Sequence, residues 1–61
     1  MQIQEGDTVQ FTPKNGGTFP TGEKTRLAVV EKLQSEEVII RQLRDDFTDR
    51  VSYDRIQQVN S

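Results

Sequence analysis

The sequence contains no cysteine, no histidine and no tryptophan. Without cysteine, no disulfide can hold the chain together. Without cysteine and histidine, the chain also has no imidazole base, no thiol nucleophile and none of the nitrogen and sulfur ligands of an ordinary zinc site. A chain of 61 residues offers little volume in which to shelter a site built from the remaining groups. We therefore predict a protein that is not an enzyme and that carries no cofactor and no metal. An oligomeric enzyme with its site on a symmetry axis is the remaining catalytic alternative.

Long apolar runs and an excess of basic charge are also missing. No stretch approaches the roughly 20 apolar residues that span a bilayer. Residues 1–5 lack the basic start and apolar stretch of a signal peptide, so a cytoplasmic location without membrane contact is expected. Eight lysines and arginines stand against ten acidic residues, for a net charge of −2. This balance argues against non-specific binding to nucleic acid, whose affinity comes largely from neutralising phosphates.

Hydrophobic residues make up only 31% of the chain. A domain of this length buries about 60% of the surface that its unfolded chain exposes. A thin core in such a domain usually needs a staple or a partner. The sequence therefore indicates either an economically packed core or one that a second copy or another protein completes.

The first half of the chain predicts a strand followed by a long loop. Val9 and Phe11 alternate with polar residues, which is the pattern of a half-buried strand. Pro13 ends this strand because proline cannot donate to a sheet. Residues 13–22 are rich in glycine and proline and contain an Asn-Gly pair that is typical of tight turns. A loop of this length in a small domain is usually functional or mobile.

The second half predicts a hairpin and two further short strands. Residues 25–33 and 37–43 form the hairpin, because the β-branched run 38–40 favours strand. A helix over residues 23–33 is the alternative, since leucine, alanine, glutamate and lysine favour helices. A short strand over residues 49–52 follows.

The two ends of the chain carry a family resemblance. Gly6-Asp7-Thr8-Val9 opens the first strand, and residues 51–59 (VSYDRIQQV) suggest a strand end, one helical turn and a closing strand with Ile56 and Val59 inward. These segments resemble the SH3-like small β-barrel superfamily, which includes SH3, Tudor and KOW-type domains. The resemblance implies a mainly β fold in one domain over residues 1–61: a five-stranded barrel with a long loop after strand 1 and a single 3-10 turn before the last strand. The aromatic pairs of peptide-binding SH3 domains and the glycine-and-basic hairpin of KOW domains are missing, and a fold does not by itself imply a function.

Three aromatic residues are candidates for binding a partner. Phe19, Phe47 and Tyr53 lie in the long loop, the second loop and the helical turn, which SH3-like barrels bring to one side. Aromatic and arginine side chains dominate interaction hot spots, so these residues are predicted to bind a protein together with Arg50 or Arg55. The alternative is that the two phenylalanines close the ends of the barrel.

Ile39 is predicted to be exposed on the hairpin. If Val38 and Ile40 point inward, then Ile39 and Leu43 point outward beside Arg41. An outward isoleucine indicates a surface that a partner or a second copy covers, or a different register. We therefore add Ile39 to the predicted partner-binding residues, with a homodimer as one of the two predicted ways of covering it.

Two clusters of charge allow further interpretations. Asp45, Asp46 and Asp49 could hold a divalent cation, but a turn with Arg44 and Arg50 as ion partners is favoured. The basic residues of the hairpin could bind RNA, or they could form cross-strand pairs with Glu31 and Glu37; these residues are Lys24, Arg26, Lys32, Arg41 and Arg44. The sequence thus predicts a small protein-interaction module, with a nucleic-acid accessory domain as the alternative.

Overall fold

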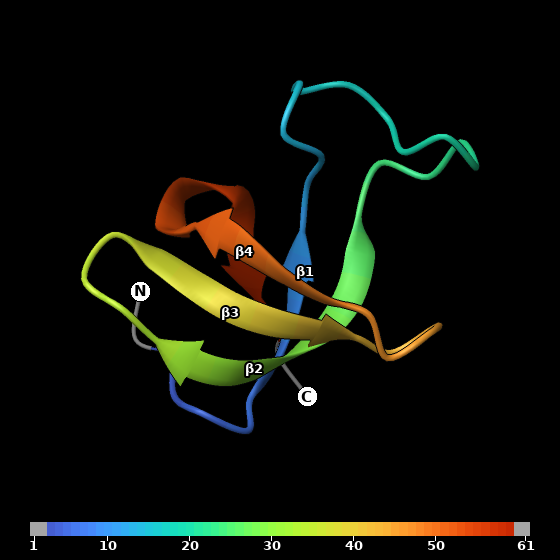
Figure 1. Cartoon of the computed structure of the whole chain (residues 1–61). Coiled ribbons are helices and arrows are strands. Elements are labelled where there is room, and N and C mark those ends of the chain that lie inside the picture. The colour runs from blue at the N-terminus through green and yellow to red at the C-terminus, as the bar shows by residue number, and fades with distance from the viewer. Residues whose placement is uncertain (1–2, 60–61) are drawn as a thin grey trace.

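The computed structural model describes residues 3–59, which form a mainly β domain (Figure 1). Within this range the elements are β1 (Thr8–Phe11), β2 (Arg26–Leu33), β3 (Glu37–Gln42), β4 (Thr48–Ser52), the 3-10 turn η1 (Tyr53–Arg55) and β5 (Ile56–Gln58). The predicted hairpin is confirmed as β2 and β3, and the alternative helix over residues 23–33 does not form. No helix in the described part of the chain is long and apolar enough to cross a membrane.

The strands form one antiparallel sheet over residues 3–59, in the order β4-β3-β2-β1-β5. β1 lies between β2 and β5, so the end of the chain returns beside its beginning. Figure 1 shows a strongly twisted sheet in which β1 runs steeply across β3 and β4. Among the described residues, β4 and β5 are edge strands that do not pair with each other, so the hydrogen-bonded sheet is not closed.

Alternating side chains of the strands form the core. In β3, Val38, Ile40 and Gln42 are buried, whereas Ile39 and Arg41 between them are only half-buried. This confirms the predicted direction of the strand, because successive side chains of a strand point to opposite faces. Within residues 3–59 the buried apolar cluster consists of Ile3, Val9, Phe11, Ala28, Val30, Val38, Ile40, Val51 and Ile56. Val59, which was predicted to point inward, is half-buried and lies outside this cluster.

A β-bulge bends β2. Val30 pairs with Ile40, but Lys32 rather than Glu31 pairs with Ile39. The extra residue strengthens the local twist of the sheet. Residues 26–29 of β2 pair with β1. Beyond the bulge, β2 pairs with β3 and no longer with β1.

Turns hold the loops in place at both ends of β1. The Gly6 amide donates to the Val30 carbonyl at 2.8 Å, which ties the segment before β1 to β2. In the long loop, the Gly16 amide donates to the Pro13 carbonyl at 3.1 Å. Gly16 has φ of 77°, a left-handed conformation that glycine adopts without steric cost. The predicted Asn-Gly turn is thereby confirmed.

Candidate functional site

Strands β2, β3 and β4 have one face that points away from the core and carries apolar side chains. We call it the outer face; along each strand its residues alternate with the core residues. Cross-strand pairing places Val29 opposite Arg41 and Ile39 opposite Arg50. At one end of this face the Leu43 amide donates to the Leu27 carbonyl at 3.1 Å, so these two leucines are direct cross-strand neighbours. Their side chains are 45% (Leu27) and 47% (Leu43) exposed.

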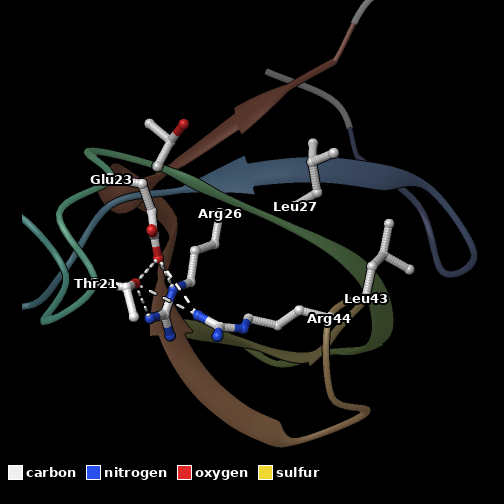
Figure 2. A pocket seen from close by; sticks show the side chains of 7 residues that line it. Thr21, Glu23, Arg26, Leu27, Leu43 and Arg44 are labelled. Carbon is white, nitrogen blue, oxygen red and sulfur yellow. Dashed lines mark hydrogen bonds and ion pairs between the residues drawn. The ribbon is translucent and has the colours of Figure 1, made fainter.

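A shallow hollow of about 570 Å³ lies beside this leucine pair (Figure 2). We call it the leucine–arginine hollow. Its lining comes from the end of the long loop, the start of β2 and the residues after β3, and consists of Thr21, Glu23, Thr25, Arg26, Leu27, Leu43 and Arg44. The hollow thus combines an exposed apolar pair with two guanidinium groups and one carboxylate.

Arg26 is fixed by contacts on all sides of its guanidinium group. The group lies 4.1 Å from the centroid of the Phe19 ring, a cation–π distance. Its Nε donates to Glu23 at 2.6 Å, and its Nη1 donates to the buried Gln42 at 3.2 Å. Its Nη2 donates to the Thr21 hydroxyl at 3.1 Å. Each nitrogen of Arg26 therefore has a partner within the domain.

Glu23 is the acceptor at the centre of the same network. One of its carboxylate oxygens, Oε1, accepts from the Thr21 hydroxyl at 2.5 Å and from Arg26. These two hydrogen bonds, Thr21 first, lower the pKa of Glu23 from 4.5 to about 2. Glu23 consequently stays ionised at physiological pH.

Arg44 is held more loosely than Arg26. Among residues 3–59 its polar contacts are to the Thr21 hydroxyl and the Glu23 carboxylate, both at 3.5 Å from Nη1. These distances are long for hydrogen bonds. The Arg44 side chain is 50% exposed. Its guanidinium group can therefore offer donors to an acceptor that enters the hollow.

Two of the predicted partner-binding residues come together elsewhere on the outer face. Ile39 and Arg50 are cross-strand partners, and they line a second shallow hollow with Thr48 and Asp49. Ile39 is half-buried, whereas the Arg50 side chain is 71% exposed and lies 3.8 Å from Glu37. This hollow is more polar than the leucine–arginine hollow, because Ile39 is its one apolar residue.

The three aromatic candidates do not gather in one patch. Tyr53 follows β4 at the start of β3, where Ser52 pairs with Glu37. Phe47 lies at the opposite end of β3, where its carbonyl accepts from the Gln42 amide at 2.9 Å. The expectation that the loops carrying them approach on one side is therefore wrong, because β3 runs between the two positions.

Burial also separates the aromatic residues. Phe19 packs edge-on against Phe11, with ring centroids 5.4 Å apart, and is half-buried against the core. Tyr53 also packs against the core, and its hydroxyl donates to the Gln34 carbonyl at 2.5 Å. Phe47 is 62% exposed. The alternative that phenylalanines close the ends of the core thus describes Phe19 but not Phe47.

The acidic loop is a turn. Asp45 accepts from the Phe47 amide at 3.0 Å, and Asp46 pairs with Arg41 at 2.8 Å. The ion pair of Asp46 is thus formed with Arg41 and not with the predicted partners Arg44 and Arg50. No group of three potential metal ligands occurs within the described range.

The three arginines of the basic set, Arg26, Arg41 and Arg44, each contact a carboxylate. Arg41 contacts Asp46 and also Glu31, at 3.3 Å, and both hydrogen bonds, Asp46 first, raise its pKa above the ordinary value. The Arg41–Glu31 contact is the expected cross-strand pair. Glu37 instead contacts Arg50 of β4, so the second expected pair forms with a different arginine.

The leucine–arginine hollow was not predicted from the sequence. Leu43 was expected to point outward, but Leu27 was not matched with it, although the hairpin register places the two side by side. Arg44 was assigned to the acidic loop. No protein-family model matches this chain, and comparisons with curated proteins and with solved structures find no match. The geometry of the surface is therefore the basis on which its function is inferred.

Proposed function

We propose that the domain is a small, non-enzymatic protein-interaction module that binds through the outer face of β2–β3–β4. The observation that carries this proposal is the pair Leu27 and Leu43, adjacent and each nearly half exposed, next to the loosely held Arg44. Single exposed leucines are ordinary on protein surfaces. An adjacent apolar pair with an arginine at its border combines two features of protein interfaces, an apolar centre and an enrichment in arginine.

The same face contains part of the predicted contact set. Ile39 and Arg50 lie on it, so a partner of ordinary size could cover both hollows. Phe47 lies in the β3–β4 turn and is largely exposed, so it is available to a partner at the border of the face. Phe19 and Tyr53 pack against the buried core, so they stabilise the domain and do not contact the partner.

We also propose that the fold is an SH3-like barrel that is partly open. Three features support this: the strand order with β1 between β2 and β5, the long loop between β1 and β2, and the 3-10 turn before β5. The OB-fold, another small five-stranded barrel, is also partly open. A solution structure in which the strands spread into a flat sheet would contradict the proposal.

Nucleic-acid binding is the less favoured function. Arg41 on the outer face contacts two carboxylates, and Arg50 lies near a third. A phosphate backbone would have to displace these carboxylates, whereas a protein partner could cover them. Fluorescence-polarisation titration with RNA and DNA at about 50 mM salt tests the alternative, because electrostatic contacts are strongest at low salt. Saturable binding there would favour the nucleic-acid function.

The proposed function is tested by replacing one exposed leucine. We expect Leu43→Ser to reduce affinity capture of a partner from the native host at least about tenfold, because truncation of a side chain that dominates an interface costs about 2 kcal/mol or more and about 1.4 kcal/mol is tenfold in affinity. The matched control is Leu33→Ser, which removes a 36% exposed leucine at the far end of β2. A captured protein is then titrated in purified form against both variants, and thermal unfolding verifies that each is folded. Equal binding by the two variants would overturn the proposal.

A further inference from the structure

The leucine–arginine hollow has a chemical character that selects among protein partners. Resting on the proposed function, we infer that it binds an extended acidic peptide segment in which an aliphatic side chain and a carboxylate face the hollow together. The aliphatic side chain packs on Leu27 and Leu43, and the carboxylate pairs with Arg44. Three observations support this assignment: the apolar pair, the unequal state of the two arginines and the charge of the hollow.

The apolar part of the hollow is formed by the leucine pair alone. Figure 2 shows Leu27 and Leu43 close together at one side of the hollow, with the Arg44 side chain running from beside Leu43 toward Thr21 and Glu23. Burial of an aliphatic side chain there removes apolar surface of both partners from water. The small size of the pair suits one side chain better than a continuous apolar helix face.

The two arginines have different roles. Arg26 has all its nitrogens engaged with Glu23, Gln42 and Thr21, so it shapes the hollow. Arg44 makes only long contacts to neighbours in the described range, and its guanidinium can turn toward a carboxylate and bind both oxygens. Arg44 is therefore the residue that recognises the ligand.

The charge of the hollow favours one carboxylate. Arg26 and Arg44 contribute two positive charges and the ionised Glu23 one negative charge, which leaves one positive charge on a chain whose net charge is −2. The oxygen of Glu23 that faces Arg26 already accepts two short hydrogen bonds. It therefore has little capacity left to accept a hydrogen bond from a ligand lysine. A ligand carboxylate neutralises the hollow.

The spacing follows from strand geometry. In an extended peptide, residues i and i+2 point to the same side. A Leu-x-Glu segment therefore presents its leucine to the apolar pair and its carboxylate to Arg44. The probe is the synthetic peptide acetyl-Gly-Leu-Thr-Glu-Gly-amide. Its controls replace glutamate by glutamine or leucine by serine.

The test is an NMR titration of the isotope-labelled chain with these three peptides. We expect the Leu27 and Leu43 methyl groups and the Arg44 Nε–H to shift saturably with the Leu-Thr-Glu peptide, and each control peptide to bind about fivefold more weakly. Arg44→Gln should abolish the preference for glutamate over glutamine. The matched control Arg50→Gln, on the same face outside the hollow, should keep it.

The outcomes separate this inference from the proposed function. No saturable shift up to about 10 mM peptide, or equal binding of the glutamate and glutamine peptides, would overturn the inference. If Leu43→Ser still abolishes partner capture in that case, the interaction module stands and only its ligand class is wrong. If RNA instead shifts the same groups, both proposals fail together.

Discussion

At the scale of single residues, Arg26 joins the core to the surface. Its guanidinium lies over the ring of Phe19, and it donates to the buried Gln42 and to the exposed network around Glu23. Gln42 would be costly to bury without such a partner. Within residues 3–59 every buried side-chain nitrogen and oxygen has a hydrogen-bond partner, and Arg26 supplies one of them.

The pH dependence of stability tests the Glu23 network. The pKa of Glu23 in the folded protein, about 2, lies below its ordinary value of 4.5, so the folded state binds fewer protons than the unfolded state between these values. The stabilisation is therefore fully present above pH 4.5 and is lost as the pH falls toward 2. An NMR titration of the Glu23 carboxyl carbon should give a midpoint near 2, and Glu23→Gln should remove this part of the pH dependence.

A companion variant separates the two donors. Thr21→Val removes the hydroxyl that donates to Glu23 and leaves the contact with Arg26, so the pKa of Glu23 should rise from about 2 toward its ordinary value. A midpoint near 4.5 in the unsubstituted protein would show that the network does not persist in solution.

At the scale of secondary structure, β4 is an edge strand that is protected from pairing. The hydrogen bond from the Gln42 amide to the Phe47 carbonyl sets the phase of the β3–β4 ladder. In this phase the Arg50 amide points away from β3. It donates instead to the side chain of Asp49, at 2.8 Å. Asp49 thereby occupies a donor that another strand would need, and charged residues on an edge also oppose strand addition.

Removal of the Asp49 side chain should favour self-association. We expect Asp49→Ala to strengthen dimerisation at least about tenfold, because a free amide and one less negative charge remain on the edge. Sedimentation velocity over a range of concentrations measures the change. Asp45→Ala alters the net charge equally but frees an amide in the turn, so it serves as the control. Equal behaviour of the two variants would show that Asp49 does not protect the edge.

At the scale of the whole molecule, long-range side-chain hydrogen bonds supplement a small core. The Tyr53 hydroxyl connects the 3-10 turn to the β2–β3 turn through the Gln34 carbonyl. Arg55 donates from Nε and Nη2 to the Thr12 carbonyl, at 3.0 and 2.7 Å, which connects the same turn to the end of β1. The single helical turn thus joins segments that lie far apart in the sequence.

Tyr53 should therefore matter for stability, and Phe47 should not. We expect Tyr53→Phe to lower the free energy of unfolding by about 1 kcal/mol, because it removes one partly buried hydrogen bond. Phe47→Ala should change it by less than about 0.5 kcal/mol, since that side chain is largely exposed. Urea unfolding measures both. A larger loss for Phe47→Ala would mean that Phe47 packs against the domain in solution.

The sequence by itself determined the local structure of this protein. The alternation that places Val38 and Ile40 inward and Ile39 outward, and the Asn-Gly turn in the long loop, follow from side-chain period and backbone preference within a few residues. These local rules predicted the strands and the direction of Ile39 correctly. They also predicted a long loop after the first strand.

The tertiary structure alone decided which surfaces exist. The adjacency of Leu27 and Leu43, the position of Phe19 over Phe11 and the separation of Phe47 from Tyr53 all depend on strand pairing and loop paths. Pairing is a cooperative property of residues distant in sequence, and a shift of one residue would exchange the two faces of a strand. The leucine–arginine hollow therefore forms only when residues 21–27 and residues 43–44, which are distant in the sequence, lie side by side at the end of the sheet.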